Sequence, residues 1–279
     1  MGSRSQDSSS PQLKVGYLCA CYFGRRRRND GWDQSLSDPS LTFIIKQLEV
    51  LPRYATILSR ITFVCNVDEG DAEQLTSFES AQKLVEAHNT GDCSIPCNIL
   101  HRPNENYSYG AYAWGIKEHC SDLDYVFTVE DDFLPGFHGF DRDVVQRYFS
   151  NKSACGNIIG AVSVWVDDTI LAKEYNWLLP NTPPHASVSH GIMNVSIYNS
   201  VPGGFAFSDE PNMYGAATQC VYLDPYINAG YRVINMSQHY RTPYLGSRRG
   251  TKWMFGPENA PIIFEPVESR ATRVIRLKT

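Results

Sequence analysis

The first half of the sequence alternates between apolar runs of strand length and longer runs with helical spacing. The strand-like runs, rich in β-branched and aromatic residues, are Leu13–Tyr22, Ile61–Val67, Ile95–Leu100 and Tyr125–Val129. Between them, apolar residues recur at helical intervals in Ser40–Leu58, Phe78–His88 and Tyr107–His119. This alternation predicts an α/β fold, with a mostly parallel sheet, right-handed crossovers and flanking helices.

The run Tyr125–Val129 ends in three adjacent carboxylates, Glu130, Asp131 and Asp132. Three neighbouring negative charges repel one another, and the preceding residues offer no cation. Mg²⁺ and Mn²⁺ bind carboxylate oxygens and commonly share the site with phosphate oxygens. Two interpretations follow: a metal–diphosphate site at the carboxyl end of a central strand, or a solvated acidic turn.

Charged residues also follow the other strand-like runs. Arg25, Asp68, Arg102 and Asp131 all fall at or just after the end of a predicted strand. Parallel α/β sheets bind ligands outside the carboxyl ends of their strands, so this convergence favours the metal–diphosphate site. Arg25 opens a run of four arginines, whose guanidinium groups suit phosphate capture. A solvated basic loop is the alternative for that run.

Composition narrows the class of protein. The formal charge is −5 and the isoelectric point about 5.8, which gives no electrostatic case for nucleic-acid binding. The eight cysteines are scattered without a C-x-x-C pair, which suits a reducing compartment. No run reaches transmembrane length, and residues 1–12 read as a disordered polar leader. We expect a soluble, cytoplasmic protein with one domain over residues 13–279.

The second half of the chain is less regular. A strand is predicted at Asn157–Val166 and another at Tyr231–Met236, with Ala172–Val201 mostly a long loop or lid. Asp224–Ala229 reads as a short helix capped by Asp224 and stopped by Gly230. We expect residues 13–166 to bind the main ligand and residues 167–279 to form an irregular second half with flexible loops.

These segments together resemble the GT-A fold of nucleotide-sugar glycosyltransferases, a Rossmann-like sheet flanked by helices. The family-2 type and the N-acetylglucosaminyltransferase I-like type are the nearest forms. The resemblance is carried by L-K-V-G-Y-L-C-A-C-Y-F, R-P-N-E-N-Y-S-Y-G-A-Y-A-W-G-I-K-E-H and Y-V-F-T-V-E-D-D-F-L-P, where E-D-D replaces the D-x-D motif. Downstream, G-A-V-S-V-W-V-D-D and I-N-A-G-Y-R-V-I are also similar. The similarity extends over residues 13–166, just over half of the chain.

The resemblance implies a hexosyl- or pentosyltransferase that uses Mn²⁺ or Mg²⁺. It would move a sugar from a nucleoside-diphosphate sugar, with a UDP-sugar favoured, to a glycan or other hydroxyl acceptor, with inversion. The implied donor-binding residues are Ala20, Cys21, Tyr22, Arg25, Asp68, Arg102, Tyr109, Gly110, Glu130, Asp131, Arg248 and Arg249.

Asp132 is the implied direct metal ligand, and His239 is a second candidate, although a lone histidine is more often an ordinary surface or core residue. The candidate catalytic bases are Asp209 and Glu210, which lie in a Gly-rich turn. The family pattern G-x-x-x-E-D, which would identify the base, is absent from this sequence.

Two other functions fit the same residues. A sugar-phosphate nucleotidyltransferase shares the α/β sheet and the metal carboxylates, but that class usually has a Gly-rich loop after the first strand. Here the segment that begins at Gly24 has the charge and only one glycine. A non-catalytic module that binds carbohydrate or a nucleotide sugar is the third hypothesis.

Overall fold

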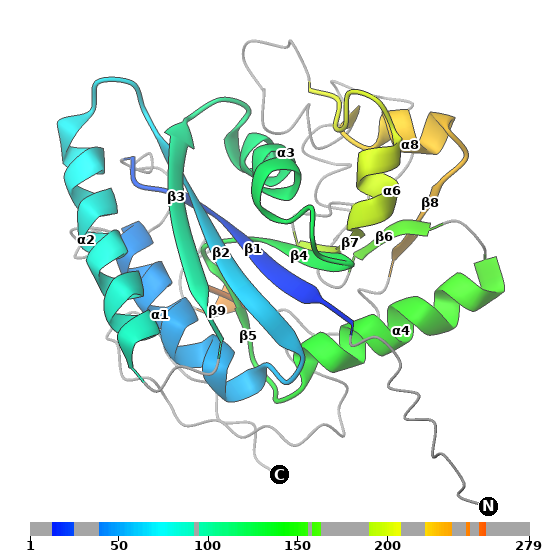
Figure 1. Cartoon of the computed structure of the whole chain (residues 1–279), viewed down its shortest axis with the longest axis horizontal. Helices are drawn as coiled ribbons and strands as arrows, with labels where there is room; N and C mark the ends of the chain where they lie inside the picture. The colour runs from blue at the N-terminus through cyan, green and yellow to red at the C-terminus, as the bar shows by residue number, and fades with distance from the viewer. Residues whose placement is uncertain are drawn as a thin grey trace, which may run out of the picture.

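Figure 1 shows the protein, a computed structural model, as a twisted sheet between two layers of helices. The structure describes residues 13–24, 39–91, 95–155, 158–162, 190–207, 221–235, 244–245 and 251–254. Within these residues, none of the helices combines the length and the apolar character needed to cross a bilayer.

The main sheet has seven strands in the described part of the chain, in the order β3-β2-β1-β4-β7-β6-β8. In chain order they are β1 (Val15–Tyr22), β2 (Leu58–Val67), β3 (Cys97–Pro103), β4 (Tyr125–Glu130), β6 (Ile158–Val162), β7 (His190–Asn194) and β8 (Arg232–Asn235). A smaller sheet, ordered β5-β10-β9, joins β5 (Phe133–Pro135), β9 (Tyr244–Leu245) and β10 (Thr251–Met254).

The helices are α1 (Pro39–Tyr54), α2 (Ala72–Thr90), α3 (Tyr107–His119), α4 (Phe140–Cys155), α6 (Val195–Ser200) and α8 (Asp224–Asn228). Strands β3, β2, β1 and β4 run parallel, whereas β7 is antiparallel to both β4 and β6. The predicted fold class is confirmed: it is an α/β fold with a mostly parallel sheet flanked by helices.

Alternate residues of β1 supply two separate cores. Tyr17, Cys19 and Cys21 face a core that is completed by α1, α2 and α4. Leu18 and Ala20 face the opposite core, which is completed by α3, α6 and α8. Figure 1 shows α1 and α2 on one side of the sheet and α3 and α6 on the other. The central strands are therefore buried on both faces, which explains their continuous apolar sequences.

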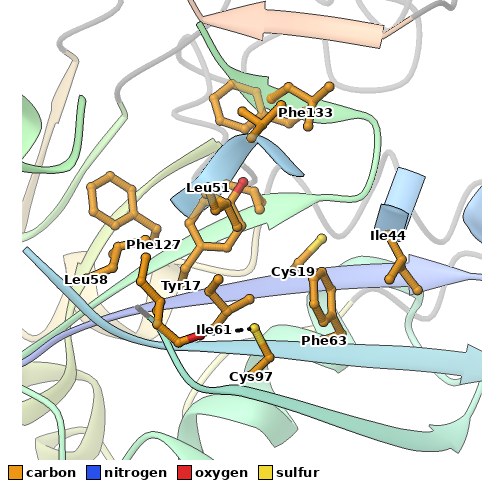
Figure 2. Close-up of a cluster of buried hydrophobic side chains, with 14 of the residues drawn as sticks. Tyr17, Cys19, Ile44, Leu51, Leu58, Ile61, Phe63, Cys97, Phe127 and Phe133 are labelled. Atoms are coloured by element: carbon orange, nitrogen blue, oxygen red, sulfur yellow. Dashed lines mark hydrogen bonds between the residues drawn. The ribbon is translucent and has the colours of Figure 1, made fainter. Parts of the chain in front are cut away.

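The first core joins α1 to the strands that lead to the acidic residues. Figure 2 shows Tyr17 of β1, Leu51 of α1 and Phe133 of β5 among its side chains. Five cysteines of the sheet and of α3's end are buried and form no disulfide: Cys19, Cys21, Cys65, Cys97 and Cys120. They behave as small apolar residues, which agrees with their positions in strand-like sequences.

Several boundaries differ from those predicted. The first helix ends at Tyr54, because residues from Leu58 onward pair with β1 as strand β2. α2 begins at Ala72, six residues before the prediction, because the side chain of Asp71 caps it by accepting a hydrogen bond from the N–H of Gln74. The sequence prediction did not take this cap into account.

The largest omission is α4, a 16-residue helix that the sequence analysis did not predict. The predicted long loop was also wrong for residues 190–200, which form β7 and α6. Asp224 does not cap α8. It is the first helical residue, and Leu223 occupies the cap position without a side-chain hydrogen bond. Gly230, the predicted stop, follows the helix with a φ of +87°.

Candidate functional site

The carboxyl ends of four parallel strands meet at one edge of the main sheet. β2 and β3 lie on one side of β1, whereas β4 lies on the other, so the strand order reverses between β1 and β4. Open α/β sheets bind ligands outside the carboxyl ends at such a switch point. The register places Ala20 of β1 opposite Glu130, the last residue of β4. The carboxyl ends of the two strands are therefore neighbours at the expected ligand edge.

The acidic turn, defined as Glu130–Asp132, continues β4 at this edge. Asp131 is 2% exposed and Asp132 is 5% exposed. Glu130 is half-buried and accepts a hydrogen bond from Oγ of Ser108 at 3.2 Å. Burying an ionised carboxylate is costly unless other groups compensate, and both aspartates have further interactions within the protein. A solvated acidic turn therefore does not describe Asp131 and Asp132.

The side chains of Ala20 and Cys21 face the two cores and not the ligand edge. Ala20 is 5% exposed and Cys21 is 1% exposed. The carbonyl of Ala20 accepts a hydrogen bond from the N–H of Asp131 at 3.0 Å, which joins the acidic turn to β1. A contact between either residue and a ligand would therefore come from the backbone.

The acidic turn suits a hard divalent cation that shares its coordination with a ligand. Carboxylate oxygens suit Mg²⁺ and Mn²⁺, and Mg²⁺ is commonly held by one or two carboxylates together with substrate phosphates. Among the residues that the structure describes, no group of three or more His, Cys, Asp or Glu side chains is placed to hold an ion. The carboxylates of the turn therefore suit a cation whose remaining coordination comes from phosphate and water.

A cluster centred on Asp68 lies at the ends of β1, β2 and β3. Oδ2 of Asp68 accepts hydrogen bonds from the Tyr22 hydroxyl at 2.6 Å and from Nε2 of Gln74 at 2.9 Å. Oδ1 accepts a hydrogen bond from Nδ2 of Asn104 at 2.8 Å. One carboxylate thus holds side chains from three segments in place.

Burial and hydrogen bonding act in opposite directions on the pKa of Asp68. Burial alone would raise this pKa, but the hydrogen bonds from Tyr22, Gln74 and Asn104 outweigh it and lower the pKa below its ordinary value. Burial, with the hydrogen bond to Asp68, raises the pKa of Tyr22 well above its ordinary value. Asp68 therefore stays ionised and Tyr22 stays neutral over the physiological range.

Arg102 fixes the connection between β3 and α3. Its Nη1 donates to Oδ1 of Asn66 at 2.8 Å and to the carbonyl of Glu105 at 2.9 Å. Nδ2 of Asn66 in turn donates to the carbonyl of Tyr107 at 3.0 Å. A Cβ atom at Gly110 would lie 2.0 Å from the Glu105 carbonyl oxygen, so the backbone of α3 approaches this connection more closely than another residue allows.

Two consecutive residues in this connection adopt left-handed backbone conformations. Asn106 has a φ of +57° and Tyr107 a φ of +51°. Such a conformation costs roughly 1–2 kcal/mol for a residue with a bulky side chain, and it occurs preferentially at functional sites. The Tyr107 side chain is 49% exposed, which makes it a large aromatic surface at the ligand edge.

Tyr109 was the predicted site residue of this segment, whereas Tyr107 was not predicted. Tyr109 is 4% exposed, with its ring centroid 4.7 Å from that of Tyr222 and 6.0 Å from that of Tyr112. It belongs to the second core. The two tyrosines are separated by a single residue in Y-S-Y, and only the register of α3 decides which of them is buried.

Six of the predicted site residues lie outside the described residues: Arg25, Asp209, Glu210, His239, Arg248 and Arg249. Their roles stay predictions. Residues 246–250, which include two of these arginines, connect β9 to β10, and Leu245 pairs with Thr251. β10 in turn pairs with β5, with Lys252 opposite Phe133. The strands on either side of these arginines are therefore joined to the strand that directly follows the acidic turn.

Comparison with solved structures finds several enzymes of low similarity. A cytidylyltransferase from Leptospira borgpetersenii is 12% identical with a TM-score of 0.42, over 80% of this chain and 75% of that one. Glucosyl-3-phosphoglycerate synthase from Mycobacterium tuberculosis, solved with phosphoglyceric acid, is 8% identical with a TM-score of 0.40, over 80% and 70%. Core-mannan synthase A from Aspergillus fumigatus, in an Mn/GDP form, is 9% identical with a TM-score of 0.39, over 96% and 82%.

No family model matches the sequence, and the search of curated proteins found no match. Because the solved structures have low identities and low TM-scores, the function proposed below rests on this chain's own residues.

Proposed function

We propose that this protein is a divalent-metal-dependent glycosyltransferase that moves a sugar from a nucleoside-diphosphate sugar to a hydroxyl acceptor. One observation supports this function above the others. Two buried carboxylates, Asp131 and Asp132, follow the central strand at the switch point of the sheet. This position combines the preferred ligand edge of the fold with the ligands that a metal–diphosphate group requires.

The nucleoside would lie over the ends of β1, β2 and β3, with uracil the favoured base. Tyr107 offers an exposed aromatic face on which a base can stack, and the Asp68 cluster lies at the same edge. Asp68 already accepts three hydrogen bonds, so its main role would be to orient Tyr22 and Asn104 toward the ribose or the base. Arg102 would hold the connection from which Tyr107 projects.

The diphosphate and the sugar would lie over the acidic turn. Asp132 would bind the cation directly, with His239 as a second ligand, and Glu130 or Asp131 would accept hydrogen bonds from sugar hydroxyls. When bound, the cation would supply positive charge to the oxygens of the leaving diphosphate. Arg25, Arg248 and Arg249 would add positive charge around the same group.

The reaction also needs a base that removes the proton of the acceptor hydroxyl. We assign this role to Asp209 or Glu210, with inversion at the anomeric carbon. The acceptor would be a glycan or another hydroxyl compound, bound by the second half of the chain.

A thermal-shift screen tests the proposed function. UDP-, GDP- and dTDP-linked sugars are added to the full chain, with and without Mn²⁺. Because a ligand that binds only the folded state stabilises it, one donor with Mn²⁺ should raise the melting temperature. Asp132→Ala should abolish the shift. Asp122→Asn, an exposed carboxylate just before β4 at the opposite edge of the sheet, should keep it.

The outcome of the screen separates the three hypotheses. A shift followed by transfer of the sugar to an acceptor supports the glycosyltransferase. Release of pyrophosphate from a nucleoside triphosphate and a sugar phosphate would instead identify a nucleotidyltransferase. Donor binding without turnover, unchanged by Asp132→Ala, would indicate a binding module, and no shift with any donor would contradict the proposed function.

A further inference from the structure

Gln47 is an amide buried beneath the acidic turn. It lies on α1, and its side chain is 0% exposed. The surrounding core is apolar and includes Ile44 and Leu51 of the same helix. An amide transferred into such a core is unfavourable unless all its polar atoms form hydrogen bonds.

The amide of Gln47 forms hydrogen bonds at both of its polar atoms. Nε2 donates to the carbonyl of Asp131 at 3.1 Å and to the carbonyl of Phe133 at 2.5 Å. Oε1 accepts a hydrogen bond from the Tyr17 hydroxyl at 3.0 Å. Because the two carbonyl groups can only accept, the amide nitrogen must face the acidic turn, and Oε1 then accepts from the Tyr17 hydroxyl.

Tyr17 is itself held firmly. It is 1% exposed on β1, and its ring centroid lies 6.3 Å from that of Phe127 and 6.4 Å from that of Phe140. Figure 2 shows Tyr17 and Leu51 of α1 among the side chains of the first core. The hydroxyl that orients Gln47 is therefore fixed by the central strand and by aromatic neighbours.

One of the two carbonyl groups bound by Gln47 lies just before residues 132–133, and the other lies at the end of this two-residue span. The Asp131 carbonyl belongs to the peptide that immediately precedes Asp132, and the Phe133 carbonyl belongs to the peptide that ends the span. The N–H of Asp131 donates to Ala20, so the turn is held by β1 as well as by α1. The orientation of a side chain follows the peptide planes on either side of it, so these bonds restrict where the Asp132 carboxylate points.

We propose that Gln47, oriented by Tyr17, is a positioning residue that holds Asp132 ready for the cation. The inference rests on the proposed function, because it assigns a role to the same metal site. Three hydrogen bonds hold the backbone of the turn: two from Gln47 of α1 and one to the carbonyl of Ala20 on β1. Groups that orient a metal ligand typically contribute 10- to 100-fold to metal affinity.

The experiment measures Mn²⁺ affinity for the full chain. Free Mn²⁺ is followed by electron paramagnetic resonance, together with the nucleoside diphosphate that gives the largest thermal shift. Gln47→Met keeps the side-chain length and removes both donors, whereas Tyr17→Phe keeps the donors and removes the orienting hydroxyl. We expect Gln47→Met to bind Mn²⁺ 10- to 100-fold more weakly and Tyr17→Phe to show a smaller loss.

Leu51→Ala is the matched control. Leu51 is fully buried one turn further along α1 and has no polar side-chain atom, so the substitution destabilises the same core without removing a hydrogen bond to the acidic turn. We expect it to leave the Mn²⁺ affinity within 2-fold of the wild type. Hydrogen exchange gives a second measurement: the amides of residues 131–134 should exchange faster in Gln47→Met than in Leu51→Ala.

The outcomes separate the two proposals. If the wild type binds Mn²⁺ and both variants bind it equally tightly, the positioning role is wrong and the metal site stands. If the wild type binds no Mn²⁺ with any nucleoside diphosphate, the metal site and the positioning role are both wrong. Should Gln47→Met fail to fold, Tyr17→Phe still decides, because unchanged affinity and unchanged exchange in that variant would overturn the proposal.

Discussion

Tyr107 combines a left-handed backbone with an exposed aromatic ring, two properties that stability alone would not select. Replacing it by glycine removes the ring and also relieves the strained φ. Because glycine is more flexible in the unfolded chain, ordering it on folding costs about 0.5–1 kcal/mol more, which offsets part of this gain. We therefore expect Tyr107→Gly to unfold at about the wild-type temperature. Because stacking contributes about 1–3 kcal/mol per base, this variant should bind the nucleoside diphosphate roughly 5- to 150-fold more weakly by calorimetry.

Tyr107→Phe is the control, because it keeps the stacking surface and should retain most of the affinity. A Tyr107→Gly variant that binds the nucleotide as tightly as the wild type would exclude Tyr107 from the binding surface. Loss of stability in the same variant would instead show that the ring packs within the protein.

The hydrogen bonds to Asp68 predict a pH dependence of stability. Its pKa in the folded state lies below the value of about 3.9 that an unfolded aspartate has. The stabilisation is therefore complete above about pH 4 and is lost as the pH falls through the folded-state pKa. In urea unfolding, the difference in stability between the wild type and Asp68→Asn should be constant from pH 7 to about pH 5 and should shrink below pH 4.

Glu69→Gln is a suitable control, because it removes one negative charge from an exposed neighbour of Asp68. At neutral pH, Glu69→Gln should change the free energy of unfolding less than Asp68→Asn does. A stability difference for Asp68→Asn that grows as the pH falls would show that the carboxylate is not stabilised in its ionised form.

Individual residues show where sequence analysis succeeds and where it fails. Glu130, Asp131 and Asp132 were recognisable because three carboxylates after an apolar strand are chemically conspicuous. Tyr107 was missed because the sign of φ depends on how Asn66 and Arg102 hold its loop, and those contacts join distant segments. Gln47 was missed because a single polar residue in an amphipathic helix does not indicate whether it faces solvent or a buried carbonyl.

At the scale of elements, Asp141 anchors α4 to the start of β2. Its side chain is 0% exposed and accepts hydrogen bonds from the N–H groups of Thr56, Ile57 and Leu58 at 2.6–3.0 Å. Leu58 is buried and Thr56 and Ile57 are part-buried, so removing the carboxylate leaves three donors without this acceptor, at about 1–3 kcal/mol for each unsatisfied group. We expect Asp141→Ala to lower the free energy of unfolding by about 3 kcal/mol or more in urea titrations.

Asp143→Ala tests the same helix without removing the anchor. Asp143 is partly exposed and pairs with Arg147 at 2.8 Å on the surface of α4, an interaction that contributes about 0.3–0.5 kcal/mol. The anchoring role of Asp141 would be refuted if Asp141→Ala and Asp143→Ala cost the same.

Two elements, α4 and β7, were not predicted from the sequence, for different physical reasons. In α4, the buried residues Phe140, Val144, Val145 and Tyr148 follow a helical period, so the helix was predictable from its sequence and was overlooked. β7 is a five-residue antiparallel strand, H-G-I-M-N, without a distinctive pattern. It forms because β4 and β6 flank it, and this long-range pairing leaves little signal in the local sequence.

At the scale of the whole molecule, alternating strands and helices were enough to predict a parallel sheet with its ligand edge at the carboxyl ends. The strand order was not predictable, because which strand lies beside β1 depends on how the helices pack on the two faces. The position of β10 beside β5 was likewise not predictable. That pairing joins the strand after Arg248 and Arg249 to the strand after the acidic turn, over more than a hundred residues of sequence.

The shared sheet also determines how the protein should unfold. Neighbouring residues of β1, such as Cys19 and Leu18, belong to the two opposite cores, so neither core can lose its strands alone. Leu51→Ala in the first core and Ile116→Ala in the second should each lower the free energy of unfolding by about 2–5 kcal/mol. In urea, both variants should keep one transition by circular dichroism and by tyrosine fluorescence. Two separate transitions in either variant would show that the cores unfold independently and would contradict a single domain.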